Sequence, residues 1–392
     1  MNFSIKTFTI IIVIFLALNS FISNAKNRGI FNENRNDCFM NASTQAISHI
    51  NELRTFYNKF KESAHSPNFE NHKPMQVLFN YLNELEKEEP SPISGSKKFR
   101  AYWVNNFTTM KNFKTGQHDA QEFISSVFDI LNNEFNKYLT EASENITQNP
   151  ISTFKLQIKK TITCNHCGYV RSIDEPGYLL PLTILYGPLS DLKHCNDLTC
   201  CLKNFFEPTV MNDWTCDNCR QKNARRLKTI SFLPKYLVIQ LKRFIYGGIA
   251  NKLDDAIKFD PIIEIDSDII DQSIKEKYHN KNFSYKLLTF ICHEGGPSGG
   301  HYWAYGKDSN NNWYKYDDST VTSITPTILI DILNQTKEIG TPYVLFYELD
   351  EKTLFSHERV HQQLTQLKSS LQELKTRLET LRKKLEILKS KL

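Results

Sequence analysis

The fold of this chain is decided by the stretch GIFNENRNDCFMNASTQ, residues 29–45. Its polar, turn-prone first half ends at Cys38, and apolar residues recur at helical spacing from there onward. The pattern predicts a helix over residues 38–63, with Asn36 or Asp37 as its N-cap and Cys38 in its first turn. The helix dipole and the free N–H groups of that turn favour the thiolate form of a cysteine.

A second informative stretch lies far downstream, where GGHYWAY (residues 299–305) is followed by WYKYDD (residues 313–318). A lone cysteine is most often a buried core residue. A cysteine upstream of a histidine and an aspartate, however, is the layout of papain-like nucleophiles. Cys38 is therefore the candidate nucleophile and His301 its candidate base.

The residues between the two halves of this stretch, DSNNN at 308–312, are typical of a turn between strands. A hairpin folded about position 309 would place Asp317 directly opposite His301, on the same face of the sheet. A slip of one residue would bring Asp318 there instead. The two glycines before the histidine lack side chains, so a peptide backbone can approach the base closely.

These stretches resemble the cysteine box and the histidine box of the ubiquitin-specific proteases. The segments QHDAQEF (117–123), QLKRF (240–244) and YVLFY (343–347) match further parts of that family, in the same order. The resemblance implies a catalytic domain over residues 28–349. Its expected fold is papain-like and α+β, with a helical thumb, a β palm and zinc-binding fingers.

The resemblance also implies a specific chemistry. The chain would be a thiol-dependent deubiquitinase that hydrolyses the isopeptide or peptide bond after the C-terminal glycine of ubiquitin. Cys38, His301 and Asp317 would be its catalytic residues. Asp119 and Glu122 would face the groove and meet the basic residues of the ubiquitin tail. Ubiquitin and ubiquitinated proteins are thus the expected partners.

Secondary-structure patterns agree with this fold class. Apolar residues recur at helical spacing over residues 117–139, whereas short β-type runs dominate from about 152 to 348. A helix-rich first half and a strand-rich second half indicate an α+β architecture.

Two Cys-x-x-Cys pairs lie in the strand-rich half, at Cys164 and Cys167 and at Cys216 and Cys219. Together they supply four soft ligands for a tetrahedral zinc ion, and a site with four protein ligands is closed and structural. The 48 residues between the pairs exceed the spacing of a simple zinc ribbon. The fingers of the family carry such an insertion, so we expect zinc-binding fingers over about 152–235.

The cysteine box departs from the family pattern at three positions. Glu33 stands where the family has an asparagine whose amide stabilises the oxyanion, Arg35 replaces a glycine, and Asp37 replaces a threonine. A carboxylate beside the nucleophile opposes thiolate formation. The alternative to an active enzyme is therefore a weak or inactive ubiquitin-binding pseudoenzyme, or a coiled-coil scaffold.

One extra residue before the cysteine shifts the alignment of the box. Asn32 or Asn34 would then take the place of the usual asparagine, with Asp318 as a further oxyanion candidate. The choice matters, because the loss of one oxyanion donor costs roughly 10²–10³ in rate.

The first 25 residues contain an apolar run, residues 8–18, and end in Ser23-Asn24-Ala25. This short run predicts a secretory signal peptide at 1–25, or else an uncleaved signal anchor. Ubiquitin is not a lumenal substrate, and four zinc thiolates suit a reducing compartment. A secreted protein would therefore act in another cell's cytosol, and a membrane-anchored one would keep its catalytic domain in the cytosol.

Apolar residues alternate at spacings of four and three near the end of the chain, which predicts a coiled coil over 356–392. The flanking e and g positions are mostly lysine and arginine, so the expected partner helix is acidic. Residues 351–392 hold ten lysines and arginines against five glutamates, which accounts for the whole net charge of +5. The rest of the chain is neutral, so its charge indicates no nucleic-acid partner.

Overall fold

The computed structural model describes residues 28–62, 73–87, 89, 91–141, 149–187, 192–245, 251–278, 282–296, 299–308, 310–336 and 340–351. The expected leader at 1–25 and the expected coiled coil at 356–392 lie outside these residues, so both stay predictions.

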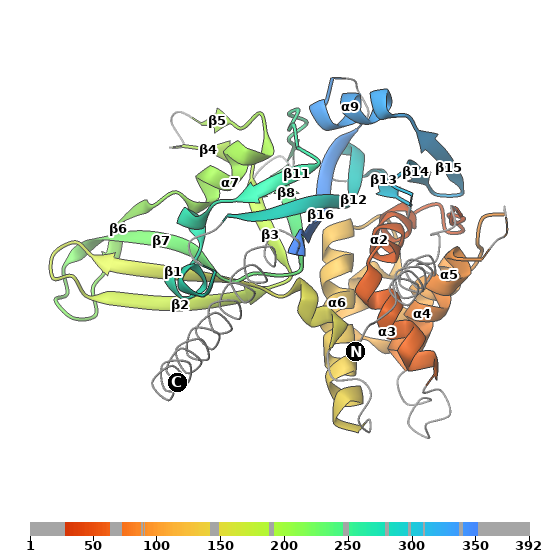
Figure 1. Ribbon diagram of the computed structural model, residues 1–392, viewed down its shortest axis with the longest axis horizontal. Helices are drawn as coiled ribbons and strands as arrows, with labels where there is room; N and C mark the ends of the chain where they lie inside the picture. Colours follow the sequence, from red (N-terminus) through yellow and green to blue (C-terminus); the bar gives the residue numbers. More distant parts are fainter. Residues whose placement is uncertain are drawn as a thin grey trace, which may run out of the picture.

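Helices form the N-terminal half of the described chain and lie together on one side of Figure 1, in red to yellow. They are α2 (Cys38–Ser48), α3 (Asn51–Glu62), α4 (Lys73–Leu85), α5 (Ser96–Asn106), the 3-10 helix η2 (Thr108–Lys114), α6 (Ala120–Glu141) and the 3-10 helix η3 (Pro150–Phe154). Among the described residues, none of the helices combines the length and the apolar character that a membrane span requires.

The single helix expected over residues 38–63 is in fact two helices, α2 and α3, which break at His49. The carbonyl oxygen of Gln45 accepts from the Ser48 hydroxyl at 2.7 Å and lies 2.7 Å from Nδ1 of His49. The backbone N–H of His49 turns instead to the carbonyl of Ala46. The side chains of Ser48 and His49 thus bond to the carbonyl of Gln45, which the next turn of the helix would need as an acceptor. For this reason α2 ends here.

An eight-stranded sheet forms the centre of the molecule, in the order β15-β14-β13-β12-β16-β8-β3, with β11 paired to β12. Its strands are β3 (Leu179–Thr183), β8 (Tyr236–Lys242), β11 (Ile262–Ile265), β12 (Phe283–Gly296), β13 (Gly299–Lys307), β14 (Trp313–Asp317), β15 (Thr320–Ile324) and β16 (Thr341–Leu349). The pairing of β3 with β8 is parallel, and the other pairings in this sheet are antiparallel. Helices first and strands second confirm the predicted α+β class.

A separate four-stranded sheet, in the order β2-β1-β7-β6, extends away from the helices (Figure 1). Its strands are β1 (Leu156–Cys164), β2 (Val170–Gly177), β6 (Thr209–Thr215) and β7 (Lys222–Phe232). Residues 152–235, expected to form the fingers, divide between the two sheets, because β3 lies between β2 and β6 in sequence but pairs with β8.

Shorter elements connect the strands of the two sheets. They are β4 (Leu185–Tyr186), β5 (Lys193–His194), α7 (Leu198–Phe206), β9 (Phe244–Ile245), β10 (Asn251–Lys252), the 3-10 helix η4 (Ser267–Ile269), α8 (Gln272–Lys277) and α9 (Pro326–Asn334).

The central strands of the eight-stranded sheet, β8, β12, β13 and β16, are buried on both faces. One face packs against α2–α6, and the other packs against α7 and α9. Residues 344–347 of β16 alternate between these two cores, with Val344 and Phe346 in the first and Leu345 and Tyr347 in the second. As a result, α2 lies directly against β13 and β14.

Candidate active site

Cys38 is the first residue of α2 and is buried, with 1% of the residue exposed. The whole of α2 is buried between α6 and the strands β13 and β14. Its hydroxyl groups bond within the helix, since Ser43 donates to the carbonyl of Phe39 and Thr44 to that of Met40. A helix enclosed in this way holds its first residue in one place, as a positioned nucleophile requires.

Asp37 occupies the N-cap position of α2, but its side chain makes no capping hydrogen bond. The carboxylate turns instead toward Arg100, with 2.8 Å between Oδ1 and Nη1. The expectation of a side-chain cap is therefore wrong, because the carboxylate is already engaged by the guanidinium of Arg100 and the hydroxyl of Ser96. Asp37 thus leaves the N–H groups in the first turn of α2 uncapped.

His301 lies on β13 and Asp317 at the end of β14, and Nε2 of the imidazole is 2.6 Å from Oδ1 of the carboxylate. The hairpin does not turn where expected. Ala304 pairs with Tyr316, and the same register places Asp317 opposite Trp303. The pairing thus differs from the expected one by two residues. Because a shift of two keeps every side chain on its face, Asp317 still reaches His301 along the diagonal.

Hydrogen bonds with Asp317 and then with Cys38 raise the pKa of His301 to about 10, against the opposing effect of burial. The contact with His301 lowers the pKa of Asp317 to about 2, and Lys315 adds to this effect at 2.7 Å from Oδ2. Because Nε2 of the imidazole faces Asp317, Nδ1 is left for the sulfur of Cys38. The thiol, the imidazole and the carboxylate therefore form one line of contacts.

We predict that conformational stability falls as the pH rises from about 6.5 to about 10. A histidine pKa raised from 6.5 to about 10 contributes stability that is fully present below pH 6.5 and is lost as the pH rises through 10. The His301 side chain is 40% exposed, so solvent screening weakens the effect. Urea unfolding across this range should show a smaller decline for His301→Gln, and equal declines would contradict the prediction.

The three oxyanion candidates have different surroundings. Nδ2 of Asn32 donates to Oδ2 of Asp318 at 2.9 Å, and Oδ1 of Asn32 accepts the backbone N–H of Asp37. Nδ2 of Asn34 lies instead between the two oxygens of Asp37, at 2.9 and 3.2 Å. Asp318 also accepts from Asn41 at 2.8 Å, and a carboxylate oxygen of it lies within 4.8 Å of the imidazole and carboxylate just described. The amide of Asn32 is thus oriented by Asp318, whereas the amide of Asn34 is bonded to Asp37.

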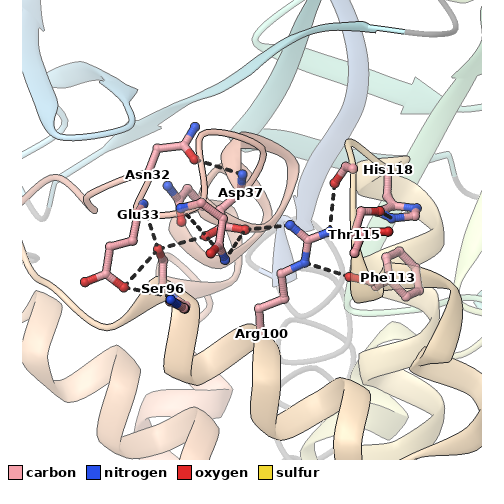
Figure 2. A network of polar contacts seen from close by, with 12 residues as sticks. Asn32, Glu33, Asp37, Ser96, Arg100, Phe113, Thr115 and His118 are labelled. Atoms are coloured by element: carbon pink, nitrogen blue, oxygen red, sulfur yellow. Dashed lines mark hydrogen bonds and ion pairs between the residues drawn. The ribbon is translucent and has the colours of Figure 1, made fainter.

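The two acidic departures in the cysteine box, Glu33 and Asp37, contact helix α5 (Figure 2). The Glu33 carboxylate accepts from two backbone N–H groups at the start of α5, at 3.0 and 2.8 Å. Asp37 accepts from the hydroxyl of Ser96 at 3.0 Å and pairs with Arg100. Both carboxylates are therefore engaged with α5.

Arg35, the third departure, has a φ of 60°, in the left-handed region where a side chain costs roughly 1–2 kcal/mol. It ends a tight turn in which its N–H donates to the carbonyl of Asn32 at 3.1 Å. We predict that Arg35→Gly raises the free energy of unfolding by about 1 kcal/mol, after the entropy that glycine adds to the unfolded chain. Arg35→Ala keeps the Cβ and should not stabilise, so equal gains in urea unfolding would contradict this explanation.

A pocket of about 200 Å³ lies beside the base, lined by Gln117, His118, Asp119, Glu122, Phe244, His293, Gly296, Gly299, Gly300 and Tyr302. Both acids expected in the groove are therefore present. Asp119 caps α6 through the N–H of Gln121 at 2.7 Å and accepts the hydroxyl of Tyr343, which is why α6 begins at Ala120. Burial raises the pKa of Asp119 and of Glu122. Glu122 is the more exposed of the two, so it has more room for a cationic ligand.

Gln117 and Arg100 contact the site, and sequence reasoning assigned a role to neither. Oε1 of Gln117 accepts the N–H of Gly300 at 2.6 Å, which ties the loop before α6 to the strand of His301. Its place in the QHDAQEF segment is the signal that could have found it. Arg100 stands in no motif. Gly300 is also required by packing, because a Cβ there would clash with β12.

The four cysteines of the Cys-x-x-Cys pairs converge at one end of the four-stranded sheet. The sulfurs of Cys164 and Cys219 are 3.6 Å apart, those of Cys167 and Cys216 are 3.7 Å apart, and all four lie within 4.8 Å of one another. A tetrahedron with zinc–sulfur bonds of about 2.3 Å has sulfurs about 3.8 Å apart. Gly168 and Arg220, one after each pair, have positive φ values that curl the two loops around the sulfurs. The cluster fits a zinc ion.

The family model described as ubiquitin carboxyl-terminal hydrolase matches residues 28–347. The chain belongs to that family. "Ubiquitin carboxyl-terminal hydrolase 25" of Arabidopsis thaliana is 28% identical over 335 residues, which cover 80% of this chain and 46% of the relative. "Ubiquitin carboxyl-terminal hydrolase 2" of Homo sapiens is 25% identical over 347 residues, which cover 80% and 54%. The chain thus spans about half the length of the curated relatives that it matches.

A solved structure of a similar fold is described as "Structure of the SAGA Ubp8/Sgf11/Sus1/Sgf73 DUB module bound to ubiquitin aldehyde". It aligns with a TM-score of 0.67 at 22% identity and covers 89% of this chain and 76% of the other. The family and the fold expected from the sequence are therefore both confirmed.

Proposed function

We propose that this protein is a thiol-dependent deubiquitinase that hydrolyses the isopeptide or peptide bond after the C-terminal glycine of ubiquitin. One observation carries the proposal: Cys38, His301 and Asp317 form one line of contacts beside a pocket lined by two carboxylates. Membership of the ubiquitin carboxyl-terminal hydrolase family supports it. So does the solved relative of similar fold, which is bound to ubiquitin aldehyde.

The reaction follows from the roles of these groups. His301 takes the proton of the Cys38 thiol, and Sγ attacks the carbonyl carbon of ubiquitin's terminal glycine. Asn32 and N–H groups in the first turn of α2 hold the oxyanion. When the tetrahedral intermediate collapses, the C–N bond breaks and His301 protonates the departing lysine amine. Water then attacks the thioester with His301 as base, which releases the ubiquitin carboxylate and restores the thiol.

Two hollows in the surface lie where different parts of ubiquitin would bind. In the smaller pocket, Asp119 and Glu122 meet the basic residues of the ubiquitin tail. A larger cavity of about 790 Å³ lies between α6 and the strands β2 and β3 and is lined mainly by polar residues. We assign the rim of this cavity, with the adjoining four-stranded sheet, to the surface that contacts the folded body of ubiquitin.

The alternative of an inactive ubiquitin-binding protein rests on Glu33, Arg35 and Asp37. The contacts of Glu33 and Asp37 with α5 weigh against it, because these carboxylates are engaged with partners of their own. Asn32 also keeps an oriented amide beside Asp318. These contacts favour an enzyme over a pseudoenzyme.

Hydrolysis of a ubiquitin–fluorophore conjugate by the purified protein tests the proposal. We expect fluorophore release that stops when thiols are alkylated. If the protein binds ubiquitin but releases no fluorophore, the pseudoenzyme is correct and the proposed function is wrong.

We further propose that the four-cysteine cluster holds one structural zinc ion. The support is the sulfur geometry and the supply of all four ligands by protein thiols, with no ligand position left for water. The ion would cross-link the two loops and take no part in the reaction.

For the termini, we propose cleavage of the leader, secretion, and action in the cytosol of another cell, with an acidic helix as the partner of the C-terminal coiled coil. Asn41 starts an Asn-x-Ser sequon but is 2% exposed and bonds to Asp318. A glycan there would be incompatible with the folded site. A mature N-terminus at Lys26 would support cleavage, whereas an intact N-terminus in a membrane fraction would support the anchor.

A further inference from the structure

Arg100 of α5 is buried, with 5% of the residue exposed, yet it makes three directed hydrogen bonds (Figure 2). Nη1 donates to Oδ1 of Asp37 at 2.8 Å, Nε to the carbonyl of Phe113 at 2.6 Å, and Nη2 to the carbonyl of Gly116 at 2.7 Å. A planar guanidinium bound through all three nitrogens is fixed in orientation, which the ammonium group of a lysine would not reproduce.

Arg100 contacts both chain neighbours of Cys38. Asp37, which precedes the cysteine, is fully buried and forms the ion pair with the guanidinium. Phe39, which follows the cysteine, has its ring centroid 5.3 Å from Cζ of Arg100, within the range of a cation–π contact. Cys38 is thus held between two residues that contact the same side chain.

A second set of contacts leads from Arg100 toward His301. Gly116, whose carbonyl accepts from Arg100, directly precedes Gln117. Gln117 in turn accepts the N–H of Gly300, the residue before His301. One buried side chain therefore links the segment of the nucleophile to the segment of the base.

Stability alone is a weak reason for such a buried ion pair, because an apolar pair of similar size often serves equally well. We propose that Arg100, acting through Asp37, is a positioning residue that holds Cys38 at reacting distance from His301. Its effect on turnover rests on the proposed deubiquitinase function. It acts through the residues beside the nucleophile and is not itself a catalytic residue.

A double variant separates positioning from folding. Arg100→Met alone leaves the Asp37 carboxylate buried without its cation, so it should lose both thermal stability and activity. Asp37→Thr combined with Arg100→Met removes both charges, and its Tm should return toward that of the wild type. We expect the double variant to cleave the ubiquitin–fluorophore conjugate with a kcat lowered about 10- to 100-fold. Its KM should be unchanged, because no group assigned to ubiquitin binding is altered.

Arg28 provides a matched control. It is also 5% exposed, and it donates to the carbonyls of Glu84 and Ser91, away from Cys38. Arg28→Met should lower Tm but leave the kcat of the folded protein unchanged. Wild-type kcat in the double variant would overturn the proposal, and so would an equal loss of kcat in Arg28→Met.

Alkylation of Cys38 by iodoacetamide at pH 7, followed by peptide mass spectrometry, makes the test independent of ubiquitin. We expect the double variant to react about tenfold more slowly than the wild type, because Cys38 loses its contact with His301. If this difference appears but the wild type does not hydrolyse ubiquitin conjugates, the deubiquitinase proposal fails and the role of Arg100 stands. Equal alkylation rates overturn the role of Arg100 whatever the ubiquitin result.

Discussion

The Cys38→Ala variant should bind ubiquitin but turn over a ubiquitin–fluorophore conjugate at least roughly 10⁴-fold more slowly than the wild type. The sulfur is the atom that forms the covalent bond to ubiquitin, and a methyl group cannot replace it. The change removes one atom from a buried position in α2, so the helix, the pocket and the ubiquitin surface stay in place. Fluorescence measures turnover, and calorimetry measures ubiquitin binding.

Cys292 offers a matched control for this variant. It lies on β12, is fully buried, and has its pKa raised to about 12 by burial, so its thiol is inert. Cys292→Ala should keep the turnover of the folded wild type. Undiminished hydrolysis by Cys38→Ala would show that another group is the nucleophile.

The Cys216→Ser variant should lose its metal and unfold the four-stranded sheet. Structural zinc contributes an apparent free energy of about 10–16 kcal/mol in zinc-finger peptides, and serine is a much poorer ligand than a thiolate. β2 is exposed along nearly its whole length. The apolar residues that β1 and β7 contribute to the hydrophobic core, Leu156, Ile158 and Ile230, lie at the end of the sheet away from the cysteines. Metal analysis should give about one zinc per wild-type chain and less in the variant. Amide hydrogen exchange should accelerate in β1 and β7 but not in β12 and β16.

His166 provides the control for the metal site. It lies within the first Cys-x-x-Cys pair but is exposed and stands apart from the four converging sulfurs. His166→Ala should therefore retain both zinc and sheet protection. A metal-free wild-type protein with a fully protected four-stranded sheet would contradict the structural role of zinc.

The sequence predicted which residues of the hairpin meet, but not the register that brings them together. His301 and Asp317 lie on the same face in both the expected and the observed pairing, because the two differ by an even number of residues. The position of the turn depends on how the loop at 308–312 closes, which the turn signal alone does not define.

Contacts between side chains distant in sequence were harder to predict. From the sequence we expect Asp37 to oppose thiolate formation at Cys38 and Glu33 to replace an oxyanion donor, because the sequence shows only how far each residue lies from Cys38 along the chain. Their partners lie on α5, some sixty residues later, at Ser96 and Arg100. No pattern of neighbouring residues in the sequence predicts these contacts, because they form only when α5 packs beside the cysteine box.

The apolar periodicity of the sequence also fails to predict where a helix ends when side chains bond to the backbone carbonyl that would continue it. The break between α2 and α3 comes from His49 and Ser48, which bond to the carbonyl of Gln45. The apolar pattern continued across this point, so periodicity alone predicted one helix. The four-cysteine cluster, in contrast, was predictable from the sequence, because the spacing of the two Cys-x-x-Cys pairs already indicated it.

The most direct test of the central claim is the reaction of the full chain with ubiquitin that carries a vinyl sulfone at its C-terminus. We expect a covalent adduct with a single ubiquitin, joined through a thioether at Cys38 and located by peptide mass spectrometry. The Cys38→Ala variant should form no adduct. Failure of the wild type to form an adduct, or attachment of ubiquitin to a different cysteine, would contradict the assignment of Cys38 as the nucleophile of a deubiquitinase.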